Sequence, residues 1–115
     1  MRPTKYHSRK ITIDNQTFDS MKEFGRWKDL QRLLGAGVIT DLKRQVKFEL
    51  IPSQKNEFGK VIERPVTYVA DFVYTKNGKQ IVEDVKGYKK GEAYKTFVIK
   101  RKLLLYVHGI RLHEV

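Results

Sequence analysis

The chain has 115 residues, of which 40% are hydrophobic and 32% are charged, and this composition is typical of one folded, soluble domain with a modest core. It contains no cysteine, which excludes disulfides, zinc–thiolate sites and thiol nucleophiles. No apolar run approaches the ~20 residues of a membrane span, and no hydrophobic signal region precedes the first charged residues. We therefore expect a cytoplasmic protein with no membrane partner.

The charge balance favours a polyanion as the partner. The chain has 24 Lys and Arg against 13 Asp and Glu, a net charge of +11. An excess of this size on a small domain is typical of proteins that bind nucleic acid, whereas a merely solubilising surface carries a smaller charge of mixed sign. A membrane-binding helix would set its cations opposite a bare apolar face, but these cations are spread along the chain.

The first segment, residues 1–12, is basic and has little apolar periodicity. It includes Arg9 and Lys10, and we expect a flexible arm that either lies along phosphates or has no role. Residues 13–115 are expected to form a single domain, because no stretch within them is long enough to be a linker between domains.

A helix is predicted from about Ser20 to Gly35. Ser20 and Glu23 have the spacing of a capping box, and glycine marks the far end. Glu23 shares a helix face with Trp27 and Leu30, which belong to the apolar stripe. Its carboxylate is therefore explained equally well by the cap alone or by a site beside a sheet.

Three strand patterns, a second helix and a final strand follow this helix. The first strand is predicted at residues 38–52, the second begins at residue 68, and the third ends at residue 87. A polar loop at 53–60 follows the first strand, and an Asn77-Gly78 hairpin turn joins the second to the third. The second helix is expected at 92–108 and the final strand at 110–115. The order α-β-β-β-α-β predicts an α/β or α+β fold, in which an antiparallel meander gains a parallel strand through a helical crossover.

The candidate site lies in the second and third of these strands. Side chains alternate along a strand, so Asp84 and Lys86 share one face, and Glu83 lies on the other. Pairing of the strands brings Asp71 close to both. Two carboxylates and an ammonium in a partly desolvated spot are costly unless a cation binds there. An Asp–Lys pair on an exposed strand would be the structural alternative.

Metal-assisted cleavage of a phosphodiester is the chemistry that these residues fit best. Asp71 and Asp84, with Glu23 if it reaches them, would hold Mg²⁺, which prefers carboxylate oxygens. The ion would polarise the phosphate, and Lys86 would position or deprotonate the attacking water. A two-carboxylate glycosidase would use Asp71 with Asp84 or Glu83, but it leaves Lys86 and the net charge unexplained.

These residues carry a resemblance to a known superfamily. Asp71 in V-A-D-F, Asp84 and Lys86 in V-E-D-V-K-G, and Glu23 in F-D-S-M-K-E resemble the PD-(D/E)xK nuclease superfamily. From about Phe18 to the end, the chain is similar to small phage and prophage proteins placed in it. The resemblance implies a restriction-endonuclease-like core, a mixed sheet flanked by helices, and Mg²⁺ or Mn²⁺ as cofactor. One departure is alanine in place of the usual proline before Asp71.

The resemblance also implies roles for individual residues. Glu23, Asp71 and Asp84 become metal ligands together with the carbonyl of Val85, and Lys86 becomes the catalytic lysine. Gln45 resembles a family position near the site, and Lys95 either faces the substrate phosphate or is solvated. With Gln45 and Lys95, the residues expected to contact nucleic acid are the cations of two basic segments, Lys89, Lys90, Arg9 and Lys10.

The sequence thus predicts a Mg²⁺-dependent endodeoxyribonuclease. Some proteins of the superfamily resolve Holliday junctions, and this resemblance alone implies branched DNA as the substrate and a role in DNA recombination. The resemblance also implies a phage origin, which would place the protein in the host cytoplasm. A homodimer is expected, because two sites related by a two-fold axis cut two strands most simply. The alternatives are a non-catalytic nucleic-acid-binding protein that keeps the fold and a structural phage component.

Overall fold

The computed structural model describes residues 10–87 and 89–115, which form a mixed α+β fold with two helices. Neither helix of this part of the chain is long and apolar enough to cross a membrane. In chain order the elements are β1 (Ile11–Ile13), β2 (Gln16–Phe18), α1 (Met21–Gly35), β3 (Thr40–Ile51), β4 (Gln54–Lys55), β5 (Val61–Glu63), β6 (Val66–Lys76), β7 (Lys79–Asp84), α2 (Gly91–His108) and β8 (His113–Glu114). The predicted combination of helices and a mixed sheet is confirmed.

The central sheet has the strand order β3-β6-β7-β8. Neighbouring strands are antiparallel except for β8, which runs parallel to β7 after the crossover through α2. Asn77 and Gly78 have φ of 52° and 75° and form the two-residue turn between β6 and β7. Both angles lie in the left-handed region that a type I′ hairpin requires, so the predicted hairpin is confirmed.

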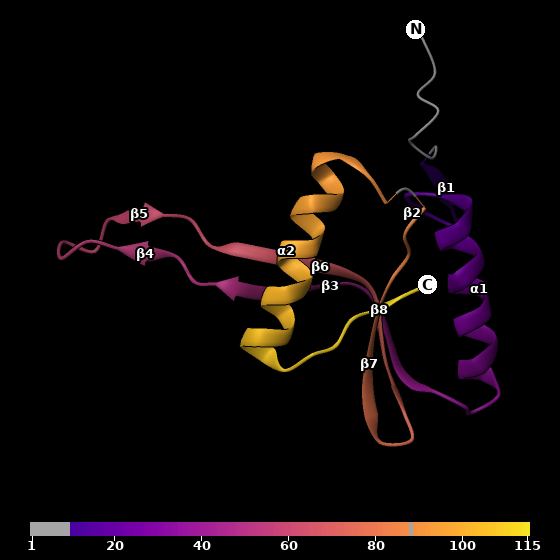
Figure 1. Ribbon diagram of the computed structural model, residues 1–115. Helices are drawn as coiled ribbons and strands as arrows, with labels where there is room; N and C mark the ends of the chain where they lie inside the picture. The colour runs from indigo at the N-terminus through magenta and orange to yellow at the C-terminus, as the bar shows by residue number, and fades with distance from the viewer. Residues whose placement is uncertain (1–9, 88) are drawn as a thin grey trace, which may run out of the picture.

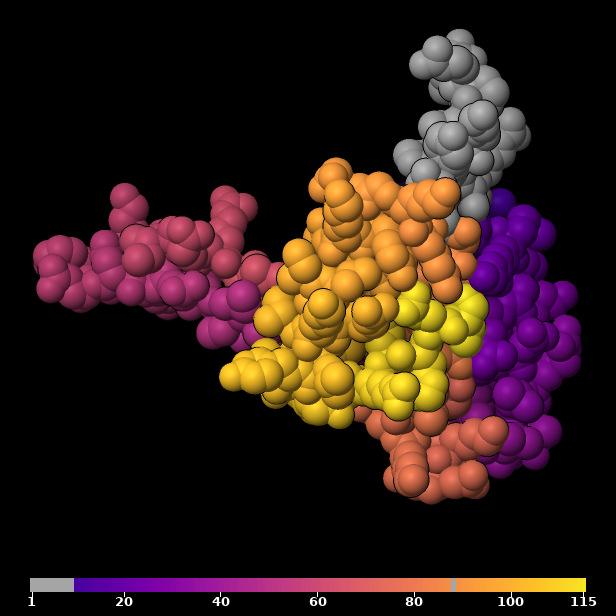
Figure 2. Space-filling view, in the orientation of Figure 1, coloured from indigo at the N-terminus to yellow at the C-terminus, as the bar shows by residue number. Residues whose placement is uncertain are grey.

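Two short strand pairs were not predicted. β1 pairs with β2 ahead of α1, so the predicted end of the basic arm is wrong at residues 11 and 12; residues 1–9 lie outside the described part. The predicted polar loop at 53–60 is wrong at Gln54 and Lys55, which pair with β5. Strands of two or three residues are too short for side-chain alternation to reveal them. β4 and β5 form a hairpin that projects from the body of the molecule (Figures 1 and 2).

Two hydrophobic cores flank the central sheet. Leu30 of α1 packs with Ile39, Phe72 and Tyr74, and Trp27 stacks on Phe72 with ring centroids 5.9 Å apart. The second core joins α2 to the sheet and contains Leu50, Tyr68, Ala70, Val73, Val82, Phe97, Leu104 and Leu112. Successive residues of β7 alternate between these cores, so α1 and α2 cover opposite faces of the sheet where β7 runs (Figure 1).

The alternation of β3 and β6 changes faces near the middle of both strands, and their register also shifts between Thr40 and Lys43 and between Glu49 and Ile51. In β6, Ala70 belongs to the α2 core and Phe72 to the α1 core, although residues two apart in a regular strand share a face. The interruption lies at Asp71, opposite Gln45 of β3, whose φ is 53° and which falls between the pairs Arg44↔Phe72 and Val46↔Ala70. This left-handed residue reorients both strands and places Asp71 at the boundary between the two cores.

A buried ion pair joins α1 to β7. Arg26 donates to both carboxylate oxygens of Glu83, at 2.8 and 2.6 Å, and the Tyr74 hydroxyl donates to the same carboxylate. The Glu83 side chain is 2% exposed. The carboxylate raises the pKa of Arg26, and burial together with Glu83 raises the pKa of Tyr74 to about 12, so the cation and the phenol keep their protons.

Arg26→Leu is expected to lower the free energy of unfolding by about 3 kcal/mol, because Glu83 would keep a buried charge without its cation. Arg32→Leu on the same helix is the matched control: Arg32 lies 2.6 Å from Asp29, but both side chains are exposed, so a loss below about 1 kcal/mol is expected. Leu and Arg have similar helix propensities, so the comparison isolates the ion pairs. Urea denaturation measures both values, and equal losses would contradict the assignment.

Candidate metal centre

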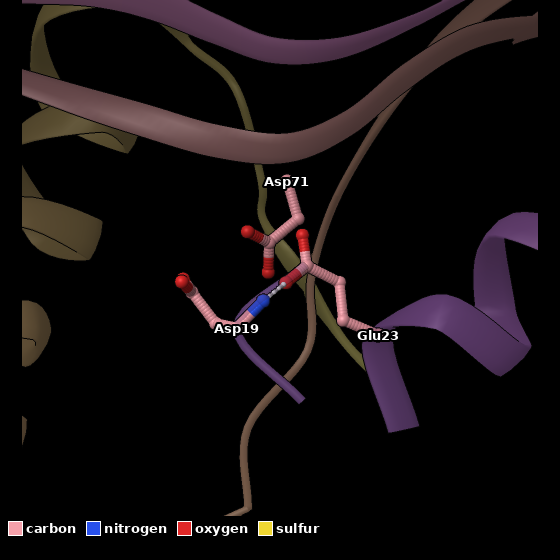
Figure 3. A group of neighbouring side chains, drawn as sticks. All are labelled: Asp19, Glu23 and Asp71. Atoms are coloured by element: carbon pink, nitrogen blue, oxygen red, sulfur yellow. Dashed lines mark hydrogen bonds between the residues drawn. The ribbon is translucent and has the colours of Figure 1, made fainter. Parts of the chain in front are cut away.

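Acidic side chains from separate segments converge beside the bend of the sheet. Asp71 comes from β6, Glu23 from the first turn of α1, and Asp19 from the residue before the helix cap. One carboxylate oxygen of each lies within 4.8 Å of the other two (Figure 3). Oxygen ligands at this spacing are what a hard divalent cation requires.

The start of α1 fixes the orientation of Glu23. The Glu23 backbone N–H donates to Ser20 Oγ at 3.1 Å, which confirms the predicted cap. Glu23 Oε1 accepts from the backbone N–H of Asp19 at 2.7 Å, while Oε2 accepts from Gln45 Nε2 at 3.2 Å. The carboxylate is 2% exposed. Glu23 therefore serves the helix start, as predicted, and its carboxylate also contacts Gln45 of the sheet; its role in a metal site stays a prediction.

Asp71 is held from two sides. Its Oδ2 accepts from the backbone N–H of Val85 at 2.8 Å, and Gln45 Nε2 lies 3.5 Å from its Oδ1. Gln45 thus bridges the carboxylates of Asp71 and Glu23 from its left-handed position in β3. Val85 contacts the cluster through its backbone N–H group, whereas the superfamily resemblance implies a metal contact through its carbonyl.

Asp84 and Lys86 form the other half of the site. The Tyr68 hydroxyl donates to Asp84 Oδ1 at 2.8 Å, and Lys86 Nζ lies 2.6 Å from Asp84 Oδ2. The same ammonium lies 3.8 Å from the centroid of the Phe97 ring, a cation–π contact. Burial and Asp84 raise the pKa of Tyr68, so this phenol stays a donor.

The carboxylates repel one another in a partly buried place. Burial, followed by the charges of Asp84 and Glu23, raises the pKa of Asp71 to about 7, although the Val85 N–H bond acts in the opposite direction. Burial also raises the pKa of Glu23, against the bond from the Asp19 N–H group. Without a cation, the folded chain therefore holds these groups at a cost when they are ionised.

The donor set fits Mg²⁺ or Mn²⁺. It consists of carboxylate oxygens, the ligands that these hard ions prefer, and it lacks the soft ligands that other metals select. Asp84 Oδ2 is buried and is paired with Lys86 Nζ at 2.6 Å. A bound cation would offset the burial and the neighbouring charges that together raise the pKa of Asp71.

Of the remaining predicted residues, only Lys10 lies beside a described carboxylate of this cluster, namely Asp19. Glu83 lies on the α1 face with Arg26, as strand alternation predicts, and not with Lys86. The predicted nucleic-acid contacts lie on or near the surface: Lys95 pairs with Glu92 at 3.2 Å, Lys89 lies 4.0 Å from Glu114, Lys90 is the residue before α2, and Lys10 lies 3.9 Å from Asp19. Arg9 lies outside the described residues.

Sequence reasoning missed four residues of the site. Asp19 precedes the helix cap, and Tyr68 and Phe97 belong to apolar stripes. Arg44 lies on a strand pattern in which polar and apolar residues alternate, and its Nη2 lies 3.6 Å from Glu23 Oε2. The Arg44 guanidinium also lies 3.9 Å from the Phe18 ring centroid. The only available signal was the position of Asp19 four residues before Glu23 at the helix start.

Comparison with known proteins gives one match. The family model described as "Protein of unknown function (DUF1064)" matches residues 3–113. No curated protein and no solved structure matches the chain.

Asp71→Asn is expected to stabilise the metal-free protein. Because the pKa of Asp71 is raised in the folded state to about 7, the wild type loses stability as pH rises from about 4 to about 7, and this loss persists at higher pH. The amide carries no charge and keeps an acceptor for the Val85 N–H group. In EDTA at pH 8 we expect a gain of about 2 kcal/mol, with a smaller gain at pH 5.

Chemical denaturation at the two pH values measures this gain. Glu49→Gln is the matched control, since Glu49 is an exposed carboxylate on β3 outside the cluster. The control should change stability little at either pH. A gain that is absent, or equal at both pH values, would show that Asp71 is not under electrostatic stress.

Proposed function

We propose that this chain, which belongs to the DUF1064 family, is a divalent-metal-dependent endodeoxyribonuclease with a restriction-endonuclease-like core. The supporting observation is the convergence of Asp71, Asp84 and Lys86, which strand alternation and the Val85 N–H bond bring together beside Glu23. This is the set of residues that hydrolysis of a phosphodiester requires: carboxylates for a hard cation and an ammonium beside them.

The metal-holding residues are Glu23, Asp71 and Asp84. The carboxylate oxygens that lie within 4.8 Å of one another belong to Asp19, Glu23 and Asp71, so the geometry adds Asp19 as an exposed carboxylate, while Asp84 is a neighbour of Asp71 alone. When bound, Mg²⁺ or Mn²⁺ supplies Lewis-acid polarisation of the phosphate and lowers the pKa of a coordinated water. Gln45 keeps the carboxylates of Glu23 and Asp71 in register through its amide.

Lys86 is the residue whose ammonium contacts the substrate phosphate or the attacking water. Its side chain is 23% exposed, so the ammonium is open to one side while Asp84 and Phe97 hold it from the others. In this position it orients a phosphate oxygen or the attacking water and offsets the negative charge that develops at phosphorus. The backbone carbonyl of Lys86 accepts from Lys22 Nζ at 2.8 Å, which ties this segment to α1.

The substrate is DNA, supported by the net charge of +11, to which the basic residues Lys89, Lys90 and Lys95 in and before α2 contribute. Branched DNA, including Holliday junctions, is the class that the superfamily resemblance favours. For a phage-encoded chain the site of action is the host cytoplasm.

Lys86→Met and Asp84→Asn are each expected to lower the rate of DNA cleavage at least ~100-fold while DNA binding persists, because both remove groups at the reacting phosphate. Met keeps the apolar contact with Phe97. The assay incubates the protein with four-way junction, duplex and single-stranded DNA, in Mg²⁺ or EDTA. Lys79→Met is the matched control, since Lys79 is exposed at the other end of β7.

Each outcome of this assay decides between two functions. Mg²⁺-dependent cleavage that is lost in the two site variants and kept in the control supports the nuclease. Binding without cleavage of any substrate in Mg²⁺ or Mn²⁺ would refute it in favour of a nucleic-acid-binding protein that keeps the fold. Salt dependence of binding does not separate the two, because both depend on phosphate contacts.

Mn²⁺ or Mg²⁺ is expected to raise the melting temperature of the wild type, since an ion at 100 times its dissociation constant stabilises the folded state by about 2.7 kcal/mol. Asp71→Asn and Glu23→Gln should abolish the rise, and Asp19→Asn should reduce it, because Asp19 is the exposed member. Asp29→Asn, on α1 but outside the cluster, should leave it unchanged. An undiminished rise in Asp71→Asn would place the ion elsewhere.

A further inference from the structure

The hairpin formed by residues 52–65, here called the projecting hairpin, has no packing partner among the described residues. β3 and β6 continue past α2 and lead into β4 and β5, which extend away from both helices (Figure 1). Every residue of the projecting hairpin is exposed except Asn56, which is half-buried. A two-stranded hairpin on its own is only marginally stable in water, so one of this length gains stability from a partner.

The tip of the projecting hairpin is nevertheless well ordered by hydrogen bonds. Asn56 Oδ1 accepts from the backbone N–H groups of Phe58 and Lys60, at 2.9 and 3.0 Å. The Asn56 N–H donates to the Lys60 carbonyl at 2.9 Å, and Gly59, with φ of 80°, closes the turn by donating to the Asn56 carbonyl at 3.0 Å. This arrangement holds Phe58 at the tip, where it is 85% exposed.

More apolar surface continues from this aromatic tip. Ile62 is 59% exposed and Val61 is 46% exposed, both in β5, directly after the turn. A large exposed aromatic next to two exposed β-branched residues is an unusual way to solubilise a protruding element, because protruding edges normally carry charge instead.

The charge of the projecting hairpin argues against DNA as its partner. It carries Lys55, Lys60 and Arg64 against Glu57 and Glu63, which is only one of the eleven net positive charges of the chain. A nucleic-acid contact would concentrate cations here. The two signs instead alternate along the hairpin, so a second copy in the opposite orientation can set each lysine against a glutamate.

We propose that the projecting hairpin is a dimerisation element that packs against the projecting hairpin of a second copy about a two-fold axis. Two chains with a charge of +11 each repel, so they associate most readily through a near-neutral apolar element that keeps their bodies apart. Phe58 and Ile62 of each copy are buried in the contact. The inference deepens the proposed function, on which it rests for its purpose: the dimer presents two metal sites to two DNA strands.

The first test replaces the apolar residues. Because Phe58 and Ile62 make no buried contact in the single chain, Phe58→Ser/Ile62→Ser should fold normally, as circular dichroism would report. Sedimentation velocity, without DNA or metal, is expected to find the wild type dimeric at micromolar concentration and the variant at least ~10-fold weaker in self-association. Tyr106→Ser is the matched control, an 87% exposed aromatic on α2 that should leave the dimer intact.

The second test uses the charges. Glu57→Lys/Glu63→Lys makes the projecting hairpin wholly positive, and Lys55→Glu/Lys60→Glu makes it mostly negative. Each variant alone should be monomeric, and an equimolar mixture should form a heterodimer, because the opposed signs then match. Restoration by mixing cannot arise from a folding defect.

Three outcomes would overturn the proposal. They are a wild type that stays monomeric up to ~100 μM, a serine variant that dimerises as tightly as the wild type, and charge variants that fail to recover on mixing. If the wild type is monomeric and the serine variant binds DNA more weakly, the projecting hairpin would be a DNA-binding element instead. None of these measurements depends on cleavage, so a failure here is separate from a failure of the nuclease assignment.

Discussion

The architecture depends on the left-handed conformation of Gln45 in the middle of the long strand β3, which also has Asp41 in this region near its start. Gln45, at φ 53°, interrupts the alternation of β3, and Asp71 opposite it interrupts that of β6. Without this interruption, one face of both strands would serve a single core along their whole length. With it, Ala70 before the bend faces the α2 core and Phe72 after the bend faces the α1 core, and the carboxylate of Asp71 lies at the boundary between them. A strained backbone conformation in such a place is typical of functional sites.

The boundary between the two cores is electrostatically unfavourable, because it gathers carboxylates in a partly buried place, and neighbouring groups partly stabilise them. Burial, followed by the charges of Asp84 and Glu23, raises the pKa of Asp71, so its ionised form is costly in this partly buried volume. Fixed groups offset part of it: the Val85 N–H group and the Gln45 amide for Asp71, and Lys86 and Tyr68 for Asp84. The Arg26–Glu83 pair on the opposite face fixes α1 against β7, so the carboxylates cannot separate to lower their energy. Stress that is retained in this way favours binding of a cation.

Those features that depend on local rules could be predicted from the sequence. The Asn77-Gly78 turn, the Ser20 cap and the opposite facing of Glu83 and Asp84 each follow from one to four neighbouring residues. The bend could not be predicted, because a positive φ at glutamine has no sequence signature and arises from the tertiary packing of two helices. For the same reason the partners that reach the site across the sheet, Tyr68 and Arg44, were missed: each looks like an ordinary member of a strand until the faces are known.

The bend also links the site to the projecting hairpin. Beyond Gln45 and Asp71, β3 and β6 stay paired from Val46↔Ala70 to Ile51↔Val66, where the projecting hairpin begins. Phe48 and Leu50 anchor this stretch to the α2 core, which also contains the Phe97 ring under Lys86. Paired strands and one core therefore connect the carboxylates to the base of the projecting hairpin, where the register shifts between Glu49 and Ile51. In a dimer built on the projecting hairpins, the length of β3 and β6 would accordingly contribute to the separation of the two metal sites, and this separation would determine which DNA geometry can reach both sites at once.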